Sequence, residues 1–482
     1  MVGIINPTYL EVFLLSASLL NYFVMFFFFI HFCLFLVVFS THLWKKLLNK
    51  LNIIFRYFFT VVIIIFILYF FKLYLIFKYG AVGVPGYGLN FHQVNFFFFG
   101  DTLICLALFI TTISWIYLGE RYLLNNLFFV MYFLVFIVCT IGMVSTSNVL
   151  SVILFFELIF LPSLVFVYKF GYSDKVEKTI LYLLLWTMTG SLAVLGGTAY
   201  LYTITKSLDI SFLLKFKYSN DEKNVLFFLF FFGFGVKIPI WPFHYWLTKV
   251  HVEAPTGFSI FLSGFLVKTA FFCLTYFYQM FVTPQLKNIA LCFIFVGALD
   301  ASFRMWSVTD IKRLIAFATI QEMNLIFLFF ILLGNNNYII LNMFLLVHGI
   351  LSGFLFFLID QVQKQFSTRN LTSISGAARL SPMLHNIIWF AILVFRGFPV
   401  FIKFYIEYEL LNILTINFYF LGCIFFFLVS FFGIIGFARI WFSIIYGQPS
   451  IKNSKLIFKK DIMVAIIFIF ILTFLQLFIF MF

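Results

Sequence analysis

The sequence predicts an all-helical protein, a polytopic bundle that crosses a membrane about fourteen times. Three observations carry this prediction: 64% of the 482 residues are hydrophobic, only 10% are charged, and the mean hydropathy is +1.13. A water-soluble chain carries about 25% charged residues, so this chain could not cover a surface exposed to water. A spanning helix takes about 20 apolar residues, and apolar runs of about that length alternate with short charged or polar loops along the chain.

The apolar runs place the expected spans in order along the chain. They lie near 9–41, 51–77, 101–119, 126–146, 149–168, 179–204, 224–248, 257–280, 287–305, 311–333, 338–361, 384–412, 415–446 and 461–481. Only 206–223 and 362–380 are sizeable polar loops, and neither is long enough for a separate domain. We therefore divide the chain into N-terminal spans (1–100), a core (101–412) and C-terminal spans (413–482).

The net charge of +14 does not indicate a nucleic-acid-binding protein, because the basic residues lie mostly in short loops between apolar runs. The tightest group is Lys45, Lys46, Lys50 and Arg56, between the first two runs. Nucleic-acid surfaces need Lys and Arg clustered on a solvated face. Short basic loops instead follow the positive-inside rule for membrane proteins.

The sequence gives no sign of a metal, iron–sulfur or nucleotide centre. The six cysteines fall one to a segment, without a CxxC pair or a Cys/His cluster. The glycine-rich stretch 83–88 is a turn-rich loop that follows no strand, so it does not indicate a phosphate cradle. We therefore expect no cofactor in this chain.

Two features favour an organelle-encoded membrane protein. The chain contains 80 phenylalanines. Lipid accepts Phe, Leu and Ile almost interchangeably, so this excess indicates codon bias in an AT-rich genome rather than a functional requirement. The N-terminal stretch carries Glu11 and no arginine, unlike an Arg-rich import presequence.

Proline marks expected interruptions of the helices. Pro162, Pro239, Pro242 and Pro399 all lie within apolar runs, and each removes a helix hydrogen bond and tends to kink or break its helix. Interrupted helices at membrane depth are tolerated where protein or a water-filled cavity satisfies the freed backbone groups. Such a pair, in the seventh and twelfth spans, predicts broken helices in two inverted repeats and indicates a transport path near the membrane midplane. We expect one break between Lys237 and His251, and another near Pro399.

Ionisable groups lie deep within five of the apolar runs. They are Glu157, Lys237, Lys268, His348, and Glu407 with Lys403. A charge at the bilayer centre costs about 2.5–3.5 kcal/mol on insertion scales, so these groups must face the bundle interior and pair with one another. We expect Glu157 and Lys237 to lie within ion-pair distance. The set serves either as structural ion pairs that fix helix register or as a conduit for protons or ions.

Several motifs resemble the antiporter-like membrane subunits of respiratory complex I. GVKIPIWPFHYWLTKVHVEAPT (235–256) resembles their broken seventh helix, and Lys268 falls where the family has its eighth-helix lysine. FFELIFLPS around Glu157, TDIKRLIAFATIQEM (309–323), VHGILSG around His348 and GFPVFIKFYIE (397–407) are similar to further family motifs. The resemblance covers about 150–410. Residues 1–100 match poorly, beyond Phe99-Gly100-Asp101.

The resemblance implies a function in proton translocation. Glu157 would pair with Lys237 and tune the pKa of this lysine, and protons would pass along the midplane to Lys268 through histidine and water. Glu407 would pass charge to the exit on the far side or to a neighbouring subunit. It further implies that NADH, FMN, iron–sulfur clusters and ubiquinone belong to other subunits, and that the partners are membrane-arm subunits, including other antiporter-like ones, in the mitochondrial inner membrane. The alternatives are a subunit of a multi-subunit cation/proton antiporter, a stand-alone transporter, and a structural assembly subunit.

Some positions depart from the family pattern or leave two readings open. Glu322 stands where the family usually has histidine, and it either substitutes as a relay carboxylate or faces a polar helix end. Lys403 lies four residues before Glu407 and therefore on the same helical face. His244 is either a relay or a structural hydrogen-bonding group.

The remaining polar pairs favour structural roles. Asp300 and Arg304 form an expected self-neutralising i,i+4 pair. His251 and Glu253 favour fixing of the connection between two helices over proton transfer.

Overall fold

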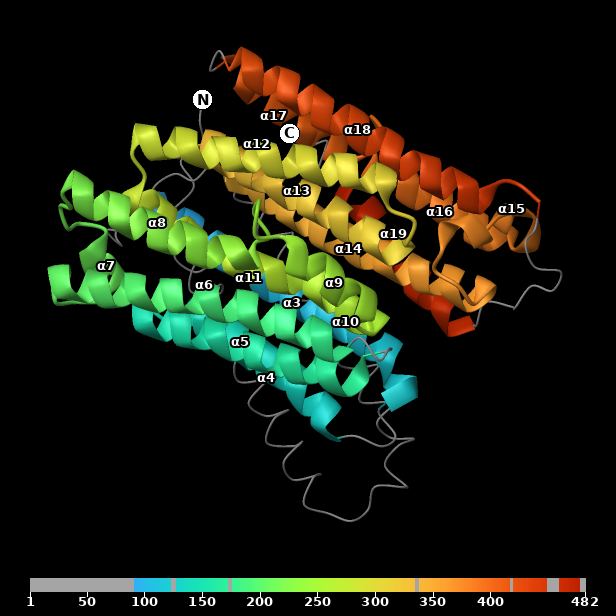
Figure 1. Ribbon diagram of the computed structural model, residues 1–482, viewed down its shortest axis with the longest axis horizontal. Coiled ribbons are helices and arrows are strands. Elements are labelled where there is room, and N and C mark those ends of the chain that lie inside the picture. Colours follow the sequence, from blue (N-terminus) through green and yellow to red (C-terminus); the bar gives the residue numbers. More distant parts are fainter. Residues whose placement is uncertain are drawn as a thin grey trace, which may run out of the picture. The chain divides into compact units, whose positions relative to one another are not determined.

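The computed structural model describes residues 91–122, 127–171, 176–333, 338–416, 419–448 and 459–476, where every regular element is a helix (Figure 1). The expected spans 9–41 and 51–77, the basic loop between them and the 83–88 turn lie outside the described residues. The α-helices are α3 (Phe91–Tyr122), α4 (Leu127–Ser145), α5 (Val149–Phe170), α6 (Val176–Thr205), α7 (Ile210–Leu213), α8 (Asn220–Lys237), α9 (Tyr245–Glu253), α10 (Thr256–Phe261), α11 (Val267–Phe281), α12 (Pro284–Ser307), α13 (Ile311–Leu333), α14 (Tyr338–Phe366), α15 (Ala377–Leu380), α16 (Pro382–Phe395), α17 (Ile402–Ile416), α18 (Phe420–Ile445) and α19 (Lys459–Gln476).

The all-helical membrane fold expected from the sequence is confirmed. Within the described ranges, seven helical segments are long and apolar enough to cross a membrane: α5, α6, α10 to α11, α12, α13, α14 and α18. Shorter apolar helices lie within α3, α4, α16 and α19. Each span expected after residue 100 therefore coincides with one helix or with two helices in series.

Two successive runs of five spans share one internal pattern. The first run consists of α4, α5, α6, α8 with α9, and α10 with α11. The second consists of α12, α13, α14, α16 with α17, and α18. In each run the fourth span is interrupted. Because five crossings are an odd number, the second run begins on the opposite side of the membrane, and the two runs form an inverted pair.

The first interruption separates α8 from α9, as the prolines predicted. α8 ends at Lys237 and α9 begins at Tyr245, and Pro239 and Pro242 lie in the non-helical segment between them. Trp246 is fully buried, and its indole Nε1 donates to the carbonyl of Val236, 2.8 Å away. This bond ties α9 to the last turn of α8 and satisfies a carbonyl that the break has freed.

The second interruption lies at 396–401, between α16 and α17, and confirms the expectation near Pro399. Gly397 has φ of +59°, a backbone conformation that favours glycine. Pro162 does not interrupt its helix, and α5 runs from Val149 to Phe170. The proline removes one hydrogen bond from the helix, but the helical turns before and after it pack on neighbouring helices and keep α5 helical.

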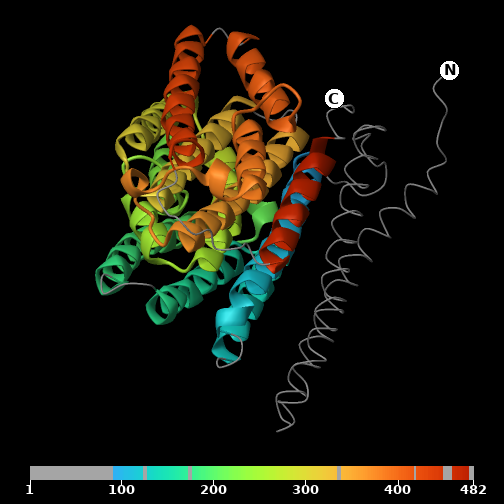
Figure 2. The same ribbon diagram turned by 90° about the vertical axis from the view of Figure 1, so that its right-hand side faces the viewer.

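The centre of the bundle differs clearly from its periphery. The spans of α13 and of α10 to α11 are wholly buried, and α14 is almost so, whereas about a third of the α6 and α18 spans is buried. The C-terminal α19 lies beside α3 (Figure 2), with the Phe109 and Phe468 rings 6.0 Å apart, and it also packs on α14 through Phe354. The apolar outer faces of α6 and α18 are suited to lipid or to neighbouring subunits.

The eighth span contains a feature that the sequence did not predict. Residues Leu262–Leu266 form a π-helical segment between α10 and α11. A β-carbon on Gly349 of α14 would lie 2.8 Å from the carbonyl oxygen of Gly264 in this segment and 2.9 Å from Leu106. The two backbones therefore approach as closely as glycine allows, the usual way in which small residues let membrane helices meet.

We expect Gly349→Ala to lower the stability of the protein by about 1–3 kcal/mol, because the added methyl group overpacks this contact. Gly196→Ala in α6 is the matched control, since a β-carbon there meets nothing within 4 Å. The measurement is the thermal unfolding midpoint of each variant in detergent. Equal midpoints for the two variants would contradict the close approach.

Candidate functional site

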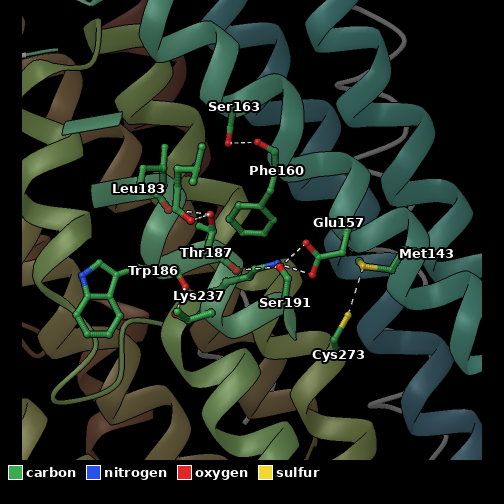
Figure 3. A network of polar contacts seen from close by, with 12 residues as sticks. Met143, Glu157, Phe160, Ser163, Leu183, Trp186, Thr187, Ser191, Lys237 and Cys273 are labelled. Carbon is green, nitrogen blue, oxygen red and sulfur yellow. Dashed lines mark hydrogen bonds and ion pairs between the residues drawn. The ribbon is translucent and has the colours of Figure 1, made fainter. Parts of the chain in front are cut away.

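The first buried ion pair joins α5 to the end of α8. The Lys237 ammonium donates to Glu157 Oε1 at 2.7 Å, and the Lys237 side chain is fully buried (Figure 3). Ser191 of α6 donates to the second carboxylate oxygen, Oε2, at 2.6 Å. The rings of Phe156 and Phe160 lie 4.2 Å from the Lys237 ammonium. The expectation that Glu157 and Lys237 form an ion pair is confirmed.

The chain positions this pair through the first interruption. Lys237 is the last residue of α8, so its side chain leaves the helix at the break. Glu157 lies in the middle of α5, and its side chain keeps 26% of its exposure. The cation is thus sealed inside the bundle, whereas its carboxylate partner reaches towards the surface.

Lys268 follows the π-helical segment and is fully buried. Its ammonium donates to the carbonyl oxygen of Ser263, within that segment. A π-helical turn contains one more residue than an α-helical turn, so it rotates the following side chains relative to those before it. The orientation of Lys268 therefore depends on a local feature with no clear signal in the sequence.

Lys268, His348 and Glu322 share one electrostatic neighbourhood in the bundle centre. The charge of Glu322 acts on Lys268, and the charges of Lys268 and Lys403 both act on His348. Both ring nitrogens of His348 and the hydroxyl of Ser263 have no hydrogen-bond partner among the described residues. Buried polar groups of this kind typically bind ordered water.

A second buried ion pair joins α13 to the start of α17. Lys403 Nζ donates to Glu322 Oε1 at 2.7 Å, lies 3.5 Å from Glu407 Oε1, and also donates to the carbonyl of Phe395. Glu322 lies in the middle of α13, and its partner Lys403 lies at the start of α17, so the carboxylate faces a polar helix end, as one of its two expected readings had it. Lys403 and Glu407 face the same way, as their spacing predicted. A β-carbon at Gly397 would lie 3.0 Å from Glu407 Oε2.

His244 belongs to a different cluster, which joins α9 to α12. Its Nε2 lies 3.1 Å from Asp300 Oδ2. Arg304 Nε donates to both Asp300 oxygens at 2.8 Å, and Arg304 Nη2 donates to the Tyr245 hydroxyl at 2.7 Å. The expected Asp300–Arg304 pair is confirmed. His244 contacts this pair rather than either Lys–Glu pair, which favours its structural reading.

The connection between α9 and α10 is held by cations that the sequence analysis did not single out. Lys312 is fully buried at the start of α13 and donates to the Ala254 carbonyl at 3.0 Å. Arg369 donates to the Val252 carbonyl at 2.5 Å. The ring of His251 stacks on Phe356, with centroids 4.5 Å apart. These contacts agree with the expectation that this region fixes the connection between two spans.

Over the ranges that the structure describes, no three His, Cys, Asp or Glu side chains gather as metal ligands. The groups that do gather are lysines and carboxylates, side chains that can exchange protons.

Residues 146–435, more than half of the chain, match the family model of the transmembrane NADH:quinone oxidoreductase/Mrp antiporter proteins. The chain belongs to this family. It is 36% identical over 356 residues to NADH-ubiquinone oxidoreductase chain 4 of Paramecium tetraurelia, a match covering 73% of this chain and 74% of the relative. It is 30% identical to chain 4 of Acanthamoeba castellanii, over 66% of this chain and 62% of that one.

Solved structures of family proteins share the fold. A chain of respiratory complex I from Thermus thermophilus superposes with a TM-score of 0.67 at 20% identity, covering 78% of this chain and 81% of that one. A chain of the Mrp complex from Dietzia sp. gives a TM-score of 0.70 at 17% identity, covering 83% and 77%. The matched family region contains both interruptions and both Lys–Glu pairs described above.

The structure brings the expected site residues together in two groups. Glu157 pairs with Lys237 in one group, and Lys268, His348, Glu322 and Glu407 belong to the other through Lys403. Sequence reasoning missed Lys312 and Ser191, and it left Lys403 without a role. A charged residue within the TDIKRL motif was a usable signal for Lys312, whereas a serine in an apolar helix gives none.

Proposed function

We propose that this chain is a chain 4-type proton-translocating subunit of an NADH:ubiquinone oxidoreductase. It couples quinone reduction elsewhere in the complex to proton movement through the bundle. The observation that carries the proposal is the gathering of bases and acids inside the bundle, which we take in this order as one row: Glu157, Lys237, Lys268, Glu322, Lys403 and Glu407. A purely structural bundle would avoid the cost of burying this many charges.

The two ends of this row differ from its middle in a way that suits transport. The Glu157 and Glu407 side chains retain 26% and 24% of their exposure, whereas Lys237 and Lys268 are fully buried. Glu157 lies on α5 of the first run and Glu407 on α17 of the second run. Protons can therefore enter or leave at each end, while the middle exchanges them only between neighbouring groups.

The middle of the row supplies the groups for exchange between Lys268 and the second pair. The charges of Lys268 and of Lys403 both act on His348, and the ring nitrogens of His348 are free to bind water. Lysine, histidine and carboxylate are suited to this work because each can both release and accept a proton when its surroundings change. We place the path within 101–412, with 1–100 and 413–482 as flanking spans.

The whole complex supplies the energy in this proposal. NADH, FMN, iron–sulfur clusters and ubiquinone belong to other subunits, and this chain holds no redox centre of its own. Its partners are the other membrane-arm subunits, including neighbouring antiporter-like ones, together with lipid. The chain 4 relatives from eukaryotes support the mitochondrial inner membrane as its location. An acidic residue at position 407 also suits chain 4, since chains 2 and 5 usually carry lysine there.

A subunit of a multi-subunit cation/proton antiporter is the second candidate. The family description includes the Mrp antiporters, and the Dietzia Mrp structure has a TM-score as high as 0.70. An antiporter subunit would use the same row of lysines and carboxylates. It would differ in its assembly, since no NADH dehydrogenase would accompany it.

Native gel electrophoresis of solubilised membranes separates these candidates. We expect the chain to migrate with NADH dehydrogenase activity, detected by an in-gel stain and by mass spectrometry of the same band. A complex that contains the chain but lacks NADH dehydrogenase activity would favour the antiporter. Migration as a single chain would contradict both candidates.

A further inference from the structure

We propose that Lys403 is a proton-carrying residue, the second-run counterpart of Lys237, that passes protons between Glu322 and Glu407. The inference rests on the proposed function and adds a step to it. It also assigns a role to the two positions, 322 and 403, at which this chain departs from the pattern of its family.

Each run of the inverted pair places one lysine beside its interruption, Lys237 at the end of α8 before the first break and Lys403 at the start of α17 after the second. Lys237 lies at the interruption of the fourth span of the first run and pairs with Glu157 on the second span. Lys403 lies at the interruption of the fourth span of the second run and pairs with Glu322 on the second span. The Nζ to Oε1 distance is 2.7 Å in both pairs. The chain therefore contains the same acid–base pair twice.

Lys403 differs from Lys237 in having a second carboxylate within reach. Its ammonium lies 3.5 Å from Glu407 Oε1 and 2.7 Å from Glu322 Oε1. A lysine stem has four carbons and rotates freely, so a small movement exchanges one partner for the other. The side chains of Lys403 and Glu322 are 3% and 5% exposed and that of Glu407 is 24% exposed, so in this proposal protons leave the cluster through Glu407.

The proton balance of the step is simple. The Lys403 ammonium gives a proton to the Glu407 carboxylate, which leaves a neutral amine and a carboxylic acid. The amine then takes a proton from Glu322 that has been protonated from the Lys268 side, which restores the ammonium and the Glu322 carboxylate. Glu407 releases its proton at the partly exposed end of the row. One proton crosses the cluster, and no group changes its oxidation state.

The residues around the cluster of Glu322, Lys403 and Glu407 position its charged groups. Glu322 acts electrostatically on Lys268, which connects the cluster to the middle of the row. Gly397, at φ of +59°, leaves room for Glu407 Oε2, and Arg396 beside it is anchored by its bond to the Ile434 carbonyl. The carbonyl of Phe395, at the end of α16, accepts a further bond from Lys403 and orients the ammonium between its two partners.

The test compares three variants in the purified complex, reconstituted in vesicles, as protons translocated per NADH oxidised. Lys403→Arg keeps the positive charge but cannot release a proton, because arginine stays protonated in proteins. The double variant Glu322→Gln with Lys403→Met removes both charges of the shorter ion pair, and Glu407, which is 24% exposed, loses its contact with Lys403. Asp360→Asn with Lys364→Met is the matched control, because Lys364 likewise contacts a second carboxylate, that of Asp461 at 3.3 Å, and this i,i+4 pair on α14 is outside the row.

We expect both cluster variants to assemble and to translocate at least twofold fewer protons per NADH than the control. Wild-type pumping by Lys403→Arg would show a structural ion pair and overturn the proposal, as would loss of assembly in both cluster variants. Lys268→Ala is measured beside them. Reduced pumping in Lys268→Ala alone would overturn this inference but not the proposed function, whereas wild-type pumping in all of these variants would overturn both.

Discussion

Replacing Lys268 with alanine is expected to remove proton pumping through this chain while leaving the complex largely assembled. Lys268 lies in an otherwise apolar span, GFSIFLSGFLVKTAFFCL, where leucine would serve packing better. It is fully buried, and its bonded partner is a backbone carbonyl, that of Ser263. A cation kept in such a place, despite an insertion cost of about 2.5–3.5 kcal/mol, is best explained by charge transfer.

The row of charged groups explains why the loss should be large. In the proposed path, Lys268 connects the Glu157–Lys237 pair to the cluster of Glu322, Lys403 and Glu407, and alanine offers no group that can hold a proton there. The measurement is proton uptake by vesicles that contain the complex, compared with NADH–quinone turnover in the same preparation. Lys215→Ala, an exposed lysine in the loop before α8, controls for the loss of a positive charge as such.

Unchanged pumping per electron pair in Lys268→Ala would make this lysine structural and the proposed path wrong at its centre. Loss of assembly in Lys268→Ala, with normal assembly in Lys215→Ala, would likewise indicate a structural role. Thermal unfolding of the purified variant separates a misassembled complex from an intact one that has stopped pumping.

Glu157→Gln is expected to destabilise the complex more than Lys237→Met does. Removal of Glu157 leaves a fully buried lysine without its counter-ion, and breaking a buried ion pair costs about 3–5 kcal/mol. Removal of Lys237 leaves a carboxylate that is 26% exposed and still accepts a bond from Ser191. Because Glu157 keeps its partial exposure and its bond from Ser191, whereas a lone Lys237 stays fully buried, we expect the two single changes to cost unequal amounts of stability.

The double variant, Glu157→Gln with Lys237→Met, is expected to recover part of the lost stability, since it buries no unpaired charge. Pumping should stay low in all three variants, because none retains an exchangeable pair. Thermal unfolding midpoints and protons per NADH are measured on the same preparations. Asp310→Asn is the control, because the Asp310–Arg369 pair is partly exposed and such pairs contribute about 0–1 kcal/mol.

Two outcomes would contradict this account of the first pair. A greater loss of stability in Lys237→Met than in Glu157→Gln would mean that burial does not decide the asymmetry. A double variant less stable than either single variant would mean that the two side chains contribute independently of each other.

The sequence by itself determined the helical membrane fold, two of its interruptions and two of its ion pairs, Glu157–Lys237 and Asp300–Arg304. Helices follow from apolar runs because the backbone has no other way to satisfy its hydrogen bonds in lipid. The breaks at Pro239, Pro242 and Pro399 follow because proline lacks the donor that a helix needs. The pairing of Glu157 with Lys237 follows from the cost of leaving either charge unpaired in the bundle.

Only the tertiary structure decided how the remaining groups meet. Glu322 and Lys403 are 81 residues apart, and their contact depends on how α13 packs against the start of α17. The π-helical segment before Lys268 and the uninterrupted course of α5 through Pro162 likewise depend on neighbouring helices. Local composition fixes which residues can be helical or charged, whereas the direction and partner of each side chain depend on packing between segments distant in the chain.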